Sequence, residues 1–204
     1  MTSPPEEFDI PIGGGFVAGG PDGIGDAVFE DLPEPEPEAM EIGAGLSADS
    51  ALEFRKTLGM FATGVTVITT QFQGQVHGMT ANAFMSVSLQ PPLVLISVGR
   101  NASLNRLLRE GVRYGISVLE SRQSALADYF GGRSPDGVEE PRFEIVRDTP
   151  LVEVALAHLV ARVVRSYWGG DHSLFLGQVE YVRYGEGEPL LFHGGRYERI
   201  VRDG

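Results

Sequence analysis

The segment GVTVITTQFQGQV, residues 64–76, decides the fold class of this chain. Residues 65–70 are β-branched without interruption, and such residues favour a pleated strand over a helix. The Gln73-Gly74-Gln75 turn that follows is typical of a hairpin whose second strand begins at Val76. The segment therefore predicts two strands joined by a short turn.

Further strands are predicted on the C-terminal side of this hairpin. Apolar runs of strand length occupy residues 84–89, 93–98, 114–119, 173–184 and 190–193. Residues 151–168 are ambiguous, because their apolar side chains fit one face of a helix and also both faces of a strand. Their Val and Tyr content favours a strand from Leu159 onward.

Three helices are predicted around these strands from their capping residues. The expected N-caps are Ser47, then Asn101 or Ser103, then Ser121, and the expected ends are Gly59 or Gly64, Gly111, and Gly131-Gly132. Six to eight short strands thus follow one another with few helices between them. This pattern predicts a mainly β, α+β fold with an antiparallel sheet or barrel and flanking helices, and it disfavours a doubly wound parallel sheet.

Negative charge is concentrated at the start of the chain. The 204 residues carry a formal net charge of −12, and residues 1–46 contain eleven Asp and Glu residues but no Lys or Arg. Clustered glycines and the alternating Pro and Glu of residues 33–38 cannot bury enough apolar surface to offset chain entropy. We therefore expect a disordered acidic leader at residues 1–46, either inert or used for partner docking, and one nearly neutral domain at residues 47–204.

Composition excludes several classes of protein. The chain has no cysteine, which excludes disulfides, thiolate metal sites and cysteine nucleophiles, and its acidity argues against nucleic-acid binding. No apolar run approaches the roughly 20 residues of a membrane helix, and the N-terminus lacks the basic-then-apolar order of a signal peptide. We expect a cytoplasmic protein without a metal site.

Three segments carry candidate chemistry. Residues 78–88 place small, hydroxyl and amide side chains beside an apolar strand, where a planar ligand can approach the backbone. Composition alone favours the alternative, an ordinary turn or bulge. Residues 98–106 lead from a strand into a helix. The free N–H groups of its first turn can bind a phosphate, or the segment is an ordinary N-cap without a ligand. Residues 169–173 place His172 beside Asp171 on a glycine turn, where the pair can contact a ligand or join two strands.

Several motifs in a fixed order along the chain are more specific evidence of a family than any one motif. FATGVTVITT at residues 61–70, HGMTANAF at 77–84, SVSLQPPLV at 86–94, GDHSLFLGQV at 170–179 and PLLFHGGRY at 189–197 together resemble the flavin reductase-like family. Its members are the small reductase components of two-component flavin-dependent monooxygenases. The resemblance covers residues 47–200 and implies a flavin-binding split β-barrel, usually a homodimer with flavin near the subunit interface. It also implies that residues 159–168 form a strand.

The resemblance implies a role for each candidate residue. The isoalloxazine ring is expected against Met79, Thr80, Ala81, Asn82 and Ala83, with Thr80 and Asn82 hydrogen-bonding nearby. The flavin tail and phosphate are expected at Ser86, Ser88, Ala102, Ser103 and Arg106. His172 is expected where the nicotinamide docks, with Asp171 orienting its turn, and Phe130 and Arg133 are expected to border the pocket.

The resemblance also implies the reaction. NADH or NADPH transfers a hydride to N5 of FAD or FMN, and the reduced flavin leaves for a partner monooxygenase. Two alternatives stay open: an electron-transfer or storage protein that binds flavin tightly on the same barrel, and a non-flavin interaction module that recruits partners through its acidic leader.

Overall fold

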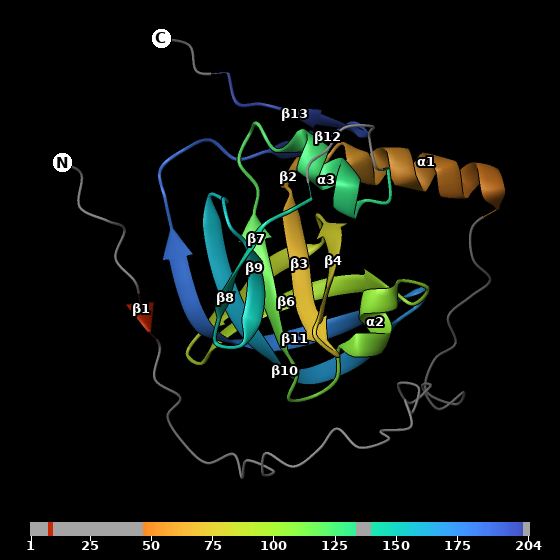
Figure 1. Ribbon diagram of the computed structural model, residues 1–204. Helices are drawn as coiled ribbons and strands as arrows, with labels where there is room; N and C mark the ends of the chain where they lie inside the picture. The colour runs from red at the N-terminus through yellow and green to blue at the C-terminus, as the bar shows by residue number, and fades with distance from the viewer. Residues whose placement is uncertain (1–7, 10–46, 134–139, 202–204) are drawn as a thin grey trace, which may run out of the picture.

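The computed structural model describes residues 8–9, 47–133 and 140–201 of the chain (Figure 1). Its main element is an antiparallel sheet with the strand order β4-β3-β7-β10-β11-β6-β5. The strands are β3 (Thr66–Phe72), β4 (Gln75–Ala81), β5 (Phe84–Leu89), β6 (Pro92–Gly99), β7 (Arg113–Val118), β10 (Ala157–Gly169) and β11 (His172–Tyr184). The sheet curls without closing, since the edge strands β4 and β5 do not pair with each other. The predicted antiparallel, mainly β fold is confirmed.

The hairpin predicted from residues 64–76 is β3 and β4. Its register runs from Phe72 opposite Gln75 to Thr66 opposite Ala81. Gln73 and Gly74 form the turn with φ values of 50° and 78°, which is the left-handed conformation that tight hairpin turns need. The strand prediction and the turn prediction were therefore both correct.

The ambiguous segment 151–168 is mainly strand. β10 runs for 13 residues and pairs with β11 along its whole length. The register of this pair shifts after Val160 and after Val163 of β10, and these shifts mark bulges. Bulges increase local twist, and this long hairpin carries much of the curl of the sheet. A separate hairpin, β8 (Phe143–Val146) and β9 (Thr149–Val152), was not predicted; its turn uses Arg147 and Asp148 at positive φ instead of glycine.

The first helix begins where the sequence predicted, whereas the other two helices begin at different residues from those predicted. α1 (Ala48–Gly59) begins at Ser47, whose hydroxyl accepts a hydrogen bond from the Ser50 amide. α2 (Ser103–Leu107) has only five residues and begins after Ala102, so neither Asn101 nor Ser103 is its N-cap. α3 (Ser124–Phe130) begins after Gln123, so the prediction of Ser121 was wrong.

The core lies inside the curled sheet in two main clusters. The larger contains Ile68, Ile96 and Phe175 from the strands, together with Leu104 of α2 and Leu108 directly after it. The second packs α3 against the ends of β3 and β7 through buried apolar residues such as Val67, Leu119 and Ala127. Burying a large side chain of this kind contributes roughly 1.5–3 kcal/mol. Gly78 lets Phe130 of α3 contact β4, because a Cβ there would come within 2.6 Å of that ring.

A short sheet covers one end of this barrel. β12 (Leu191–His193) pairs with both β13 (Arg196–Glu198) and β2 (Thr63–Gly64). Within the leader the structure describes only β1 (Phe8–Asp9), which pairs antiparallel with Val182 and Tyr181 of β11. The remaining leader residues, for which disorder was predicted, lie outside the described ranges.

Candidate functional site

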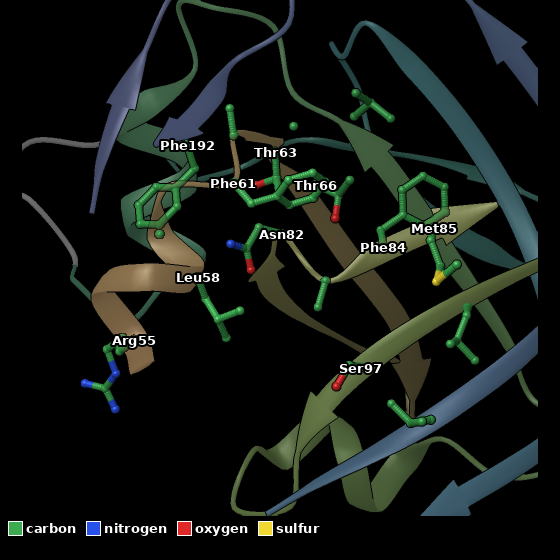
Figure 2. Close-up of a pocket in the computed structure, with 17 residues that line it drawn as sticks. Arg55, Leu58, Phe61, Thr63, Thr66, Asn82, Phe84, Met85, Ser97 and Phe192 are labelled. Atoms are coloured by element: carbon green, nitrogen blue, oxygen red, sulfur yellow. The ribbon is translucent and has the colours of Figure 1, made fainter. Parts of the chain in front are cut away.

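An open groove of about 920 Å³ lies between α1 and the edge of the main sheet (Figure 2). Its walls are mainly apolar, with Leu58 of α1, Met85 of β5 and Leu174 of β11 among them. Asn82 and Ser97 are polar members of the lining, and Figure 2 shows their polar ends directed toward the space between α1 and the sheet. The only cationic lining residue is Arg55, and no carboxylate lines the groove among the described residues.

Strand alternation explains why these side chains face the groove. On β6, Leu95 and Ser97 line it, whereas Val94, Ile96 and Val98 are buried in the core. β11 pairs Leu174 with Ser97, and because directly opposite residues of paired strands point to the same face, Leu174 shares the groove face. The same alternation places His172, two residues earlier, on this face.

His172 lies where the β10–β11 turn meets the turn after β6. His172 pairs with Gly99, and the Arg100 amide donates to the Asp171 carbonyl at 2.9 Å. His172 Nδ1 lies 2.7 Å from Asp171 Oδ1, so we assign the ring proton to Nδ1, which donates to the carboxylate and leaves Nε2 for a ligand. This hydrogen bond lowers the pKa of Asp171 below its usual range, although the carboxylate is 93% exposed.

A smaller pocket of about 190 Å³ shares Asn82 and Phe192 with the groove. Arg133 and Tyr197 also line it, and the Arg133 guanidinium lies 3.0 Å from an Asp128 carboxylate oxygen. Partial burial, with a smaller contribution from the Asp128 charge, raises the pKa of Tyr197. This pocket therefore adds a cation and a neutral phenol beside the apolar groove.

The predicted site residues fall into three groups. Asn82 and Ala83 line the groove, and Asn82, Thr80 and Arg133 line the small pocket. His172 lies at the start of β11, outside both linings, with Asp171 in the turn before it. The Thr80 hydroxyl donates to the Ala127 carbonyl at 2.6 Å, so it holds α3 against β4.

The other predicted residues lie away from the groove lining. Ala81 is buried in the core and Met79 packs against it, while Phe130 makes edge contacts with Tyr129 and Phe143. Ser86 is opposite Val94 and is not part of the groove lining, although Phe84 and Met85 before it on β5 are. Ala102, Ser103 and Arg106 lie at the short helix α2, beyond the Gly99–Arg100 turn.

The structure also adds lining residues that were not singled out from the sequence. They include Leu58, Phe61, Thr63 and Phe192, which come from α1, the segment after it, β2 and β12. Thr63 and Phe192 lie within the FATGVTVITT and PLLFHGGRY motifs, and these motifs were the sequence signal that could have identified them. Their contribution depends on the pairing of β2 with β12 across more than a hundred residues, and local sequence does not report that pairing.

Two further findings concern the described part of the chain. It contains no group of three or more His, Asp or Glu side chains arranged to hold a metal ion. Among its helices, none is long and apolar enough to cross a membrane.

The groove suits a flat, mainly apolar ligand with a polar rim. Apolar walls exclude water from a ring system, and the Asn82 amide and Ser97 hydroxyl can pair with ring oxygens or nitrogens. Its volume accommodates a tricyclic ring, with room beside it for a second aromatic ring. The groove lies on a curled, unclosed antiparallel sheet of the split-barrel type, and its lining is suited to a planar ligand.

Comparison with known proteins identifies the family. Residues 58–201 match the family described as flavin reductase like domain. An NADH-dependent flavin reductase from a Rhodococcus species is 46% identical over 154 residues, which cover 73% of this chain and 86% of that protein. The reductase component of a Thermus thermophilus 4-hydroxyphenylacetate 3-monooxygenase is 40% identical over 151 residues, covering 72% and 95%.

Comparison with solved structures leads to the same family. The NADH:FAD oxidoreductase of Streptomyces globisporus C-1027, in complex with NAD and FAD fragments, superposes with a TM-score of 0.69 at 39% identity. The match covers 79% of this chain and 99% of that chain. The chain belongs to the flavin reductase-like family.

Proposed function

We propose that this protein is an NADH-dependent flavin reductase that supplies reduced FAD or FMN to a partner monooxygenase. The observation that carries the proposal is the apolar groove with a polar rim, continuous with the face that bears His172, in a member of this family. The names of the relatives support the nicotinamide donor, the flavin acceptor and the oxygenase partner.

The residues of the chain have distinct roles in this proposal. Leu58, Met85 and Leu174 exclude water from the ring, and Asn82 and Ser97 pair with its polar edge. A bound flavin accepts a hydride at N5 from the nicotinamide ring. His172, held by Asp171, positions the donor through Nε2; hydride transfer between the two rings needs no proton from it.

The reductase assay tests this proposal. Purified protein with NADH and excess FAD or FMN is expected to consume NADH, followed by its absorbance, and to do so only when flavin is present. Parallel assays with NADPH and with each flavin establish the preferred pair. Absence of flavin-dependent oxidation of either nicotinamide would contradict the proposal, and a tightly held flavin inert to both donors would instead support a storage protein.

We further propose that two chains form a homodimer through α1 and β5. Leu52, Phe54 and Leu58 of α1 are exposed, as are Val87 and Leu89 of β5. α1 and β5 both line the groove, and large exposed apolar side chains on its two walls are typical of a surface that binds another chain. Light scattering on the eluting protein is expected to give twice the chain mass, and Leu89→Glu to give the monomer.

Release of reduced flavin to the oxygenase fits the open form of the groove, because a ligand held by one concave face leaves more easily than an enclosed one. The proposal includes a cytoplasmic location, where the nicotinamide donor is available. It also keeps residues 1–46 as a leader outside the catalytic domain of residues 47–204, a division that the truncation described below tests.

A further inference from the structure

Thr63 contains a buried hydroxyl that has no hydrogen-bond partner among the described residues. Its side chain belongs to β2 and lines the groove (Figure 2), and its Oγ1 is shielded from water. The other buried side-chain oxygen without a partner, Tyr114 Oη, lies in the core in the space left by Gly177. Thr63 is therefore the unpaired buried hydroxyl associated with the candidate site.

Neighbouring threonines show how this chain ordinarily satisfies such groups. Thr66 donates to the Ala81 carbonyl at 2.7 Å, and Thr70 donates to the Arg113 carbonyl at 2.9 Å. Thr69 and Thr80 likewise donate to backbone carbonyls, those of Pro150 and Ala127. Because nearly all buried polar groups in proteins are hydrogen-bonded, the exception at Thr63 requires a physical reason.

An unpaired buried hydroxyl destabilises the protein that contains it. Valine has almost the same shape and would fill the position without this cost, so the hydroxyl has value only if it gains a partner in some state of the protein. A partner can come from the groove, since Thr63 lines it together with Asn82 and Ser97. Phe61, two residues earlier, is 77% exposed, so its ring can shift to admit a ligand without breaking a core contact.

We propose that Thr63 is a positioning residue for the flavin ring. Its hydroxyl stays unpaired in the free protein and hydrogen-bonds to a ring nitrogen or oxygen when the groove is filled. A threonine hydroxyl both donates and accepts, and it therefore suits the polar edge of an isoalloxazine, where donors and acceptors alternate. This inference rests on the proposed function and adds a residue that couples flavin binding to the stability of the barrel.

The decisive variant is Thr63→Val, examined by flavin titration and by thermal unfolding. We expect the dissociation constant for FMN and FAD, measured by quenching of flavin fluorescence, to rise about tenfold, which corresponds to about 1.4 kcal/mol. The flavin-free variant is expected to melt at the same temperature as wild type or higher, because the buried hydroxyl is gone. Thr63→Ser, which restores the hydroxyl, is expected to bind flavin within about threefold of wild type.

Thr70→Val is the matched control, since it removes a buried hydroxyl that already has a protein partner, remote from the groove. We expect it to lower the melting temperature and to leave the flavin dissociation constant unchanged. The inference is overturned if Thr63→Val binds flavin as tightly as wild type, or if it melts lower in the manner of Thr70→Val. A wild-type protein that binds neither flavin overturns the proposed function first, and this inference with it.

Discussion

Two regions of the molecule differ in how their polar side chains are satisfied and in what they expose to solvent. Near β8 and β9, the buried His158 and the partly buried Glu144 are paired within the chain. The buried Glu180 of the adjacent β11 is likewise paired, with arginines of β7 and β10. In the groove region, the Thr63 hydroxyl has no partner in the described structure, and large apolar side chains of α1 and β5 are exposed. Paired groups of the first kind stabilise a fold, whereas unpaired groups and exposed apolar faces indicate where ligands and partner chains bind.

Glu180 is the most completely buried and paired carboxylate of this region. This carboxylate is 1% exposed and lies between two arginines, with Arg113 Nε at 2.7 Å and Arg162 on its other oxygen. The three residues come from β7, β10 and β11, which are neighbours in the sheet. A buried carboxylate is tolerated only when such partners compensate for its lost hydration.

The largest expected effect therefore comes from breaking this cluster. Glu180→Gln leaves two guanidinium groups beside a neutral amide, and we expect the free energy of unfolding in urea to fall by about 3 kcal/mol. Arg196→Gln is the control, because its partner Glu198 is at the surface, and a change below about 0.5 kcal/mol is expected there. Equal effects of the two substitutions would remove the distinction between the two regions.

The next effect concerns the groove region and changes activity instead of stability. His172→Ala is expected to lower kcat/KM for NADH about thirtyfold, roughly 2 kcal/mol of transition-state stabilisation, while the flavin dissociation constant changes less than threefold. Asp171→Asn, which keeps the ring but weakens its orientation, is expected to lose less than His172→Ala. An unchanged steady-state rate for His172→Ala would show that the groove face does not extend to this residue.

A smaller, pH-dependent effect is expected in the paired region near β8 and β9. His158 Nε2 donates to the Val152 carbonyl at 2.7 Å, and Nδ1 accepts from Arg183, so the ring is neutral. Burial, as the largest cause, lowers the pKa of His158 from its ordinary value of 6.5. Below pH 6.5 the unfolded chain therefore binds a proton that the folded chain resists, and the free energy of unfolding falls as the pH falls through this window.

Urea denaturation across this pH range tests the effect. His158→Gln retains a donor for the Val152 carbonyl but does not titrate, so its profile is expected to be flatter below pH 6.5, although the variant is less stable overall. A variant that loses stability with acid as steeply as wild type would show that other groups control this window.

Sequence was sufficient wherever the determining signal was local. The β-branched run at residues 65–70 and the Gln73-Gly74 turn specify their hairpin without help from the rest of the chain. The β8–β9 hairpin was missed because its turn contains no glycine, and Arg147, which rarely adopts positive φ, does so there beside Asp148. The N-cap of α2 was missed because the start of this short helix is set by burial of Leu104 and not by a capping side chain.

The same distinction applies to the site. Asn82 and His172 were predicted from motifs, and both lie on the groove face. Thr63 was missed because a threonine beside a glycine is unremarkable until the structure shows that its buried hydroxyl has no hydrogen-bond partner among the described residues. The roles of Ser86, Ser88 and the residues at α2 remain predictions that flavin titration of single variants can test.

The smallest effect is expected from removing the leader, which belongs to neither region. Deleting residues 1–46 removes β1, whose two residues pair only with Tyr181 and Val182, so the free energy of unfolding is expected to change by less than about 1 kcal/mol. Hydrogen exchange is expected to become faster at the edge of β11 alone. At high salt, kcat/KM is expected to stay within twofold of the full chain.

At low salt the truncated protein is expected to associate faster with NADH and flavin, because eleven carboxylates that repel anionic nucleotides are gone. The gain should vanish at high salt, once the Debye length is shorter than the distance between the leader carboxylates and the incoming nucleotide. A gain that persists at high salt would mean that the leader contacts the groove directly. Loss of the folded dimer on truncation would instead show that β1 is part of the structural core, and that the boundary of the domain lies well before Ser47.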